Sequence, residues 1–109
     1  MIGAAVVTYK KPKELAACLE SLRGQIAPGY IIVQDNSEGE NLLYTAGINK
    51  AIRTLLKEGN AGPPEFILVC CDDVTVRPSA VAEMSRYMEA NPKCGIAAPI
   101  QVGRSGAVT

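Results

Sequence analysis

Histidine is absent from this 109-residue sequence, and its four cysteines, Cys18, Cys70, Cys71 and Cys94, form no C-x-x-C pair. Structural zinc sites are built mainly from closely spaced cysteine and histidine ligands, so the sequence argues against a zinc site. Free cysteines in a reducing compartment usually behave as small buried apolar residues. We therefore expect free thiols rather than a disulfide.

Charge of either sign is not in excess, since Lys plus Arg and Asp plus Glu each number 11. This balance excludes bulk electrostatic attraction to nucleic acid or to a membrane surface. The apolar runs fall far short of the roughly 20 residues that a transmembrane helix needs. The N-terminus lacks the basic and apolar regions of a secretory signal. We expect a cytoplasmic protein with no nucleic-acid partner and no transmembrane segment.

Apolar residues are abundant enough for a folded core. Hydrophobic residues make up 48% of the sequence and charged residues 20%, which is typical of globular proteins. A chain of 109 residues suffices for one domain. No internal repeat, low-complexity tract or linker divides it, so residues 1–109 are predicted to form a single domain.

Short apolar runs alternate with helical patterns along the chain. Strands are predicted near residues 4–9, 30–35, 66–71 and 95–100, and helices from about Pro12, Thr45 and Pro78. The predicted buried helix faces contain Leu15, Cys18, Leu19 and Leu22, then Ile48, Ile52, Leu55 and Leu56, then Val81, Met84 and Met88. This alternation predicts an α/β fold with parallel strands and a sheet covered on both faces.

Polar residues follow three of the predicted strands: Thr8-Tyr9, Asp35-Asn36-Ser37 and Asp72-Asp73. In parallel α/β sheets, ligands bind outside the carboxyl ends of the strands. We therefore expect these residues to gather at one edge of the sheet. The adjacent carboxylates Asp72 and Asp73 are hard oxygen ligands, which suit Mn²⁺ or Mg²⁺ held jointly with substrate phosphates. The alternative is a structural turn after the strand, where aspartate is common.

Six segments, in the same order, resemble the family 2 glycosyltransferases of the GT-A fold. They are residues 6–12 (VVTYKKP), 15–25 (LAACLESLRGQ, with the helix ending S-L-x-x-Q), 31–37 (IIVQDNS), 41–52 (NLLYTAGINKAI), 66–76 (FILVCCDDVTV) followed by Pro78, and 95–99 (GIAAP). No single motif decides the matter, but the ordered set is specific.

The resemblance implies a Rossmann-like GT-A three-layer sandwich with a mainly parallel central sheet. It also implies a nucleotide-sugar pocket at the strand ends. In that pocket Thr8 and Tyr9 would lie against the base and ribose, and Asp35 would accept a hydrogen bond from the base or a ribose hydroxyl. Asn36, next in the chain, is also predicted to bind the nucleotide sugar. The alternative for Asp35 is a helix cap or turn residue.

The resemblance further implies that Gly47 and Asn49 lie under the diphosphate. Their alternatives are close helix packing for Gly47 and a solvated side chain for Asn49. Asp73 matches the metal-ligating carboxylate of the family. Asp72 would assist through the ribose or a metal-bound water.

Several positions depart from the family pattern. Lys10 stands where asparagine is usual, Leu43 and Ala51 stand where glycine is usual, and Cys71 stands where asparagine is frequent. The short path between residues 37 and 41 implies that a strand of the family is missing or reduced. Residues 100–109 contain no Asp, Glu or His, so the catalytic base is unassigned. The resemblance thus ends before the acceptor half of the family. The chain is expected to be either the N-terminal, donor-binding portion of a longer enzyme or a naturally short chain that binds without full catalysis.

The sequence thus predicts a glycosyltransferase-like domain that binds a UDP-, GDP- or dTDP-sugar with a divalent cation; the sugar and the acceptor stay unidentified. One alternative is a non-catalytic nucleotide-binding remnant or regulatory module. Another is a sugar-phosphate nucleotidyltransferase, although residues 10–12 (KKP) are not the glycine-rich phosphate loop of that class. A receiver-type domain would place paired acids after the first strand, where Thr8 and Tyr9 stand.

Overall fold

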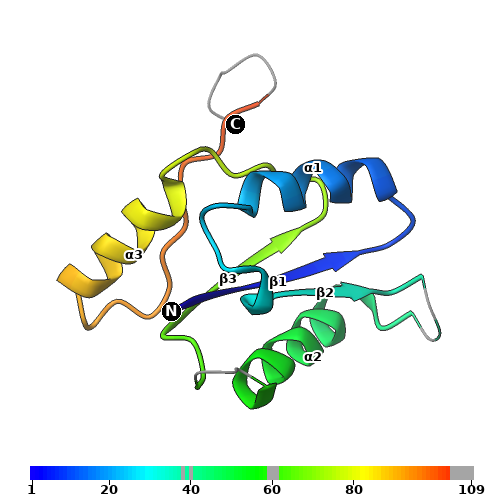
Figure 1. Cartoon of the computed structure of the whole chain (residues 1–109), viewed down its shortest axis with the longest axis horizontal. Coiled ribbons are helices and arrows are strands. Elements are labelled where there is room, and N and C mark those ends of the chain that lie inside the picture. Colours follow the sequence, from blue (N-terminus) through cyan, green and yellow to red (C-terminus); the bar gives the residue numbers. More distant parts are fainter. Residues whose placement is uncertain (38, 40, 59–61, 104–109) are drawn as a thin grey trace.

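Strand β1 (Ile2–Thr8) forms the centre of a three-stranded parallel sheet in the order β2-β1-β3. The computed structural model describes residues 1–37, 39, 41–58 and 62–103. The other elements are α1 (Pro12–Leu22), the 3₁₀ turn η1 (Pro28–Tyr30), β2 (Ile31–Asp35), α2 (Leu43–Glu58), β3 (Phe66–Cys71) and α3 (Ala80–Ala90) (Figure 1). Three predicted strands and three predicted helices are confirmed, and the arrangement is compatible with a Rossmann-like fold.

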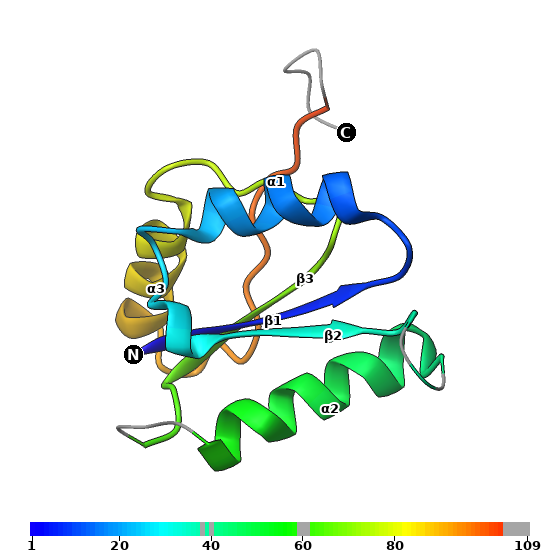
Figure 2. The ribbon, with the colours of Figure 1, turned by 45° about the vertical axis from the view of Figure 1, so that its right-hand side comes forward.

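The two faces of β1 are covered by different helices. Ala4 and Val6 lie in one buried cluster with Cys18 and Leu22 of α1, whereas Ala5 and Val7 lie in a second cluster with α2. Successive side chains of a strand point to opposite faces, so this alternation places α1 and α2 on opposite sides of the sheet (Figure 2). The predicted sheet covered on both faces is confirmed at its central strand.

Helix α1 begins as its sequence predicts. Pro12 occupies the first turn, where its missing N–H costs no hydrogen bond. Cys18 and Leu22 are fully buried, and Leu15 and Leu19 are partly buried, so the predicted face points to the core. None of the helices in the described part of the chain is long and apolar enough to cross a membrane.

The predicted fourth strand is wrong. Residues 95–100 form no strand in the structure, and they run beside α3 with Ile96 90% exposed and Ile100 79% exposed. Pro99 has no N–H to donate to a sheet ladder, and Gly95 carries no side chain to pack against a neighbour, so this apolar run is weakly suited to strand pairing.

The predicted buried face of α2 is wrong at one position. Leu56 is 52% exposed, while Ala51, which is not part of the predicted face, is 1% exposed. Ile48, Ala51, Ile52 and Leu55 follow the i, i+3, i+4, i+7 spacing, and Leu56 lies beyond the edge of that stripe. Because Ala51 is small, the helix axis can approach the sheet closely at this point.

Adjacent leucines of α2 provide a test of this assignment. Leu55→Ala should lower the free energy of unfolding by about 2–5 kcal/mol, because the Leu55 side chain fills the core between α2 and β1. Leu56→Ala should change it by less than about 1 kcal/mol. Urea unfolding of both variants measures the difference, and equal losses would place Leu56 in the core.

Candidate functional site at the carboxyl edge of the sheet

The carboxyl ends of the three strands meet at one edge of the sheet. Thr8 is the register partner of Asp35, and Val7 is the register partner of Cys71, which directly precedes Asp72. The Thr8 hydroxyl donates a hydrogen bond to Asp72 Oδ2 at 2.8 Å, and the backbone N–H of Tyr9 donates to the same oxygen at 3.3 Å. The predicted convergence of the strand ends is therefore confirmed.

The two adjacent carboxylates have different surroundings. Asp72 is only 7% exposed, and the two donors to its Oδ2 compensate for the water that burial removes. Asp73 is exposed, and no basic group of the described residues forms a salt bridge with it. Asp72 is therefore held rigidly by the fold, whereas the Asp73 carboxylate is presented to solvent.

Thr8 and Tyr9 differ in the same way. Thr8 is buried and its hydroxyl hydrogen is used by Asp72, so its observed contact is with the protein rather than with a nucleotide. Tyr9 is 44% exposed, and the Lys10 amino nitrogen lies 5.2 Å from the centre of its ring. This separation is within the range of a cation–π contact. The exposed ring offers a surface on which a planar group can stack.

Asp35 forms a local turn at the end of β2. Its Oδ1 accepts hydrogen bonds from the Ser37 hydroxyl and from the Ser37 backbone N–H, the latter at 2.9 Å. These two bonds lower the pKa of Asp35 from its ordinary value. The turn alternative for Asp35 thus has a structural basis, and the second carboxylate oxygen lies outside these two bonds.

Asn36 is a structural link between β2 and α2. Its side chain is 2% exposed, and its Nδ2 donates to the carbonyl of Leu43 at 2.8 Å while its Oδ1 accepts from Gln34 Nε2 at 3.3 Å. A Cβ placed on Gly47 would lie 3.0 Å from that Nδ2 and 3.3 Å from Val7 Cγ2. The geometry therefore favours close helix packing as the reason for glycine at position 47.

Asn49 is exposed on α2, in agreement with the alternative of a solvated side chain. Among the described residues, no hydrogen bond joins Asn49 to Thr8 or Asp72. Of the predicted site residues, the structure directly joins Thr8, Tyr9 and Asp72, with Asp73 next in the chain and Asp35 across the register. Asn36 and Gly47 have hydrogen-bond and packing contacts within the fold, and their part in nucleotide-sugar binding stays a prediction.

The donor set at this edge bears on metal binding. Across the residues that the structure describes, no group of three or more His, Cys, Asp or Glu side chains is gathered to hold a metal ion. Asp72 and Asp73 alone supply carboxylate oxygens at the end of β3. Mg²⁺ is commonly bound through one or two carboxylates together with substrate phosphates and water. The residues therefore fit a cation that arrives with a phosphate ligand, and they do not fit a site built by the protein alone.

Thiols flank the acidic pair on both faces of β3. Cys18 and Cys70 lie on the α1 side, with their Sγ atoms 4.0 Å apart, and all four cysteines are free. The hydrogen bond with Cys18 and burial raise the pKa of Cys70. On the other face, burial and the nearby carboxylates raise the pKa of Cys71. These raised values keep Cys70 and Cys71 protonated near neutral pH, so they add no negative charge beside Asp72.

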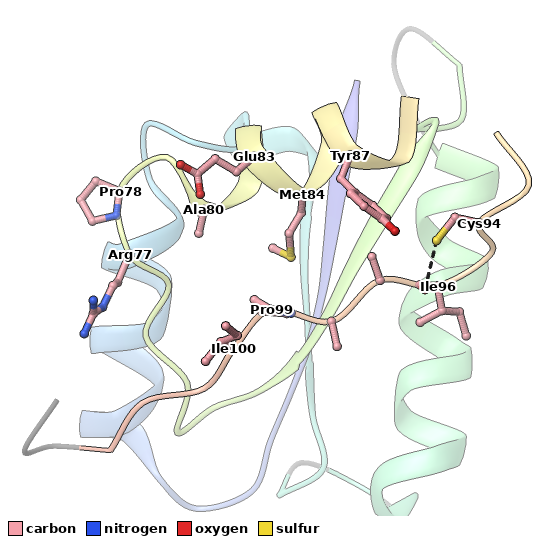
Figure 3. Close-up of a pocket in the computed structure, with 12 residues that line it drawn as sticks. Arg77, Pro78, Ala80, Glu83, Met84, Tyr87, Cys94, Ile96, Pro99 and Ile100 are labelled. Atoms are coloured by element: carbon pink, nitrogen blue, oxygen red, sulfur yellow. Dashed lines mark hydrogen bonds between the residues drawn. The ribbon is translucent and has the colours of Figure 1, made fainter. Parts of the chain in front are cut away.

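A hollow of about 660 Å³ lies elsewhere, between α3 and residues 94–100 (Figure 3). Met84 and Tyr87 of α3 form one wall, and Ile96, Pro99 and Ile100 belong to the other. Neither Asp72 nor Asp73 lines it, so it is separate from the carboxyl edge.

Comparisons of the chain with known protein families, with curated proteins and with solved structures found no match. The relation to family 2 glycosyltransferases therefore stays a hypothesis that rests on sequence motifs.

Two glycines test whether position 47 is a packing position. Gly47→Ala should lower the free energy of unfolding by about 1–3 kcal/mol, because the new methyl group would press on Asn36 and Val7. Gly29→Ala is the matched control, since a Cβ there meets no atom within 4 Å beyond the adjoining residues of the chain. It should change stability by no more than about 0.5 kcal/mol. Thermal and urea unfolding measure both, and an unaltered Gly47→Ala variant would contradict the packing role.

The Asp35 turn makes a pH-dependent contribution to stability. Because folding lowers the pKa of Asp35, its contribution is present above the ordinary value of 3.8 and is lost as the pH falls through the folded-state pKa. Ser37→Ala removes one of the two hydrogen bonds, so the pKa of Asp35 should rise. A carboxyl-carbon NMR titration measures it, with Ser85→Ala as control. Equal midpoints in the native chain and Ser37→Ala would show that the hydroxyl bond is not formed in solution.

Proposed function

We propose that this domain binds a nucleotide-diphosphate sugar together with Mn²⁺ or Mg²⁺ at the carboxyl edge of its sheet, for glycosyl transfer. The observation that carries the proposal is the exposed Asp73 carboxylate beside a buried Asp72 that Thr8 and the Tyr9 N–H hold in place. This arrangement lies where parallel α/β sheets bind ligands.

The division between the two aspartates suits a shared cation. One carboxylate oxygen of Asp72 accepts hydrogen bonds from Thr8 and Tyr9. The other oxygen can bind a metal-bound water or a ribose hydroxyl. Asp73 has an exposed carboxylate to place directly on the cation. When bound, the cation would stabilise the negative charge that develops on the diphosphate as the sugar leaves.

The neighbouring strand ends suit the nucleoside. The exposed Tyr9 ring can stack on the base, and Asp35 can accept a hydrogen bond from the base or from a ribose hydroxyl. Lys10, with its amino group beside the Tyr9 ring, adds a positive charge at the same edge. Thr8 contributes through Asp72 and not by touching the nucleotide. The base that would deprotonate an acceptor hydroxyl is unassigned.

A neutral isostere of Asp73 tests the cation site. Asp73→Asn should weaken manganese-dependent UDP binding at least about tenfold, because the exposed carboxylate is lost. The melting temperature without ligand should stay level or rise, since one of two adjacent like charges is removed. Titration calorimetry with UDP, in MnCl₂ and in EDTA, measures the affinity.

Glu89→Gln is the matched control for Asp73→Asn, because Glu89 is an exposed acid on α3. It should leave UDP affinity unchanged. Equal UDP affinity in MnCl₂ and in EDTA would remove the cation from the proposal. A large fall in the melting temperature of Asp73→Asn would instead mark Asp73 as a structural residue of the turn.

A further inference from the structure

The chain that follows Asp73 needs an anchor if the carboxylate is to hold one position. On the N-terminal side, Asp72 is fixed by Thr8 and by the β3 pairing. On the C-terminal side, residues 74–77 form neither helix nor strand before α3 begins at Ala80. The structure shows two side chains of the α1 end that reach this segment.

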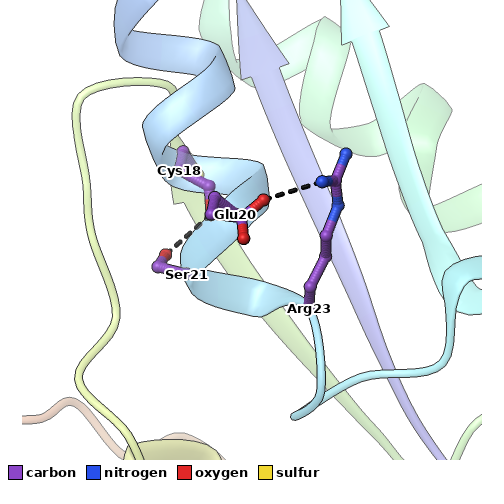
Figure 4. Close-up of polar contacts among 4 residues, drawn as sticks. All are labelled: Cys18, Glu20, Ser21 and Arg23. Atoms are coloured by element: carbon purple, nitrogen blue, oxygen red, sulfur yellow. Dashed lines mark hydrogen bonds and ion pairs between the residues drawn. The ribbon is translucent and has the colours of Figure 1, made fainter.

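Ser21 provides the first of these contacts. Its hydroxyl donates to the carbonyl of Cys18 within α1 at 2.6 Å (Figure 4). The same oxygen accepts the backbone N–H of Val76 at 3.0 Å, from a residue 55 positions later in the chain. The bond to Cys18 directs the hydroxyl hydrogen into α1 and leaves a lone pair for Val76.

Gln25 provides the second contact, directly after α1. Its Nε2 donates to the carbonyl of Ser21 at 2.8 Å and to the carbonyl of Val76 at 3.5 Å. Its Oε1 accepts the backbone N–H of Val81, in the first turn of α3, at 3.2 Å. One amide group therefore joins the end of α1 to both ends of the segment between Val76 and Val81.

The backbone around Gln25 is itself held in place. Gly24 turns the chain at a φ of 82°, which glycine adopts readily. The next residue, Ile26, is buried and returns its N–H to the carbonyl of Leu22 at 3.0 Å. Gln25 is thus fixed on both sides and can act as a rigid support.

We infer that Ser21 and Gln25 are positioning residues that hold the segment after Asp73, and so place the Asp73 carboxylate for the cation and the diphosphate. This inference rests on the proposed function. Val76 is three residues from Asp73, a stretch of chain that spans at most about 11 Å. Fixing Val76 therefore confines Asp73 between two anchors, Asp72 before it and Val76 after it.

The contacts of Ser21 and Gln25 also offer a reason for the S-L-x-x-Q sequence at the end of the first helix segment, to which the sequence alone assigns no function.

Amide hydrogen exchange tests the contacts without any ligand. Ser21→Ala should make the Val76 amide exchange about fivefold faster or more, because its acceptor is lost. Ser85→Ala is the matched control: the Ser85 hydroxyl makes the same kind of bond, to Ala82 three residues earlier, without reaching another element. Ser21→Thr keeps the hydroxyl and should restore protection.

Gln25 variants separate its two roles. Gln25→Ala should make the Val81 amide exchange faster, because its acceptor is lost. The Val76 amide donates to Ser21, so its exchange should change less than in Ser21→Ala. Gln25→Glu keeps an acceptor for Val81 but loses the donors to Ser21 and Val76, so Val81 should stay protected. Unchanged exchange of the Val76 amide in Ser21→Ala and of the Val81 amide in Gln25→Ala would overturn the inference at the level of structure.

Calorimetry with MnCl₂ and UDP then tests the effect on binding. Ser21→Ala combined with Gln25→Ala should weaken manganese-dependent UDP binding about tenfold, while Ser21→Thr and Ser85→Ala should match the native chain. Faster exchange with unchanged UDP affinity would overturn the positioning role. Absence of manganese-dependent UDP binding in the native chain would overturn the proposed function and with it the positioning role, while the exchange rates would still show whether Ser21 and Gln25 hold the segment.

Discussion

The burial of β1 is the constraint on which the rest of the structure depends. Every residue from Gly3 to Thr8 is buried, and the small side chains of Ala4 and Ala5 let a helix approach each face. Because β1 lies between β2 and β3, it fixes the register of both neighbours. Their polar ends are consequently brought to one edge. The meeting of Thr8 with Asp72 follows from this pairing.

A buried carboxylate at the end of such a strand is costly unless its lost hydration is replaced. Thr8 and the Tyr9 N–H supply two donors to one Asp72 oxygen, and Asp72 in turn orders the turn that carries Asp73. The site thus combines the buried contact of Asp72 with Thr8 and the exposed carboxylate of Asp73, the next residue in the chain. A surface aspartate without that support would sample many more positions.

The sequence predicted those features that depend on local pattern. Three apolar runs became strands, three periodic stretches became helices, and the polar residues after the strands met at one edge. It failed where the outcome depends on a partner. Residues 95–100 are apolar enough for a strand, but Pro99 has no N–H to donate to a ladder, and this segment lines the hollow beside α3. Leu56 was predicted to be buried because it is apolar and adjoins Leu55. In the structure α2 turns Ala51 toward the sheet, and Leu56 is exposed.

The sequence pattern also could not predict which contacts each site residue makes. The resemblance placed Thr8 on a nucleotide, and the structure shows that its hydroxyl is used by Asp72, 64 positions away. Only the register of β1 with β3 brings these two together. Likewise, the tight contact of Gly47 with Asn36 arises from the docking of α2 on the sheet. The contacts of Ser21 with Val76 and of Gln25 with Val81 also join residues 55 and 56 positions apart, which no local pattern predicts.

The strand order has a consequence for how the molecule folds. β1, α1 and β2 are contiguous in the chain and can associate early, since closing a short loop costs little entropy. β3 pairs with β1 across a separation of more than 60 positions, and such non-local pairing is slow. The contacts that hold Asp72 therefore form only when β3 docks. Before that step β1 pairs with β2 alone, and the edge of β1 that β3 later covers is open.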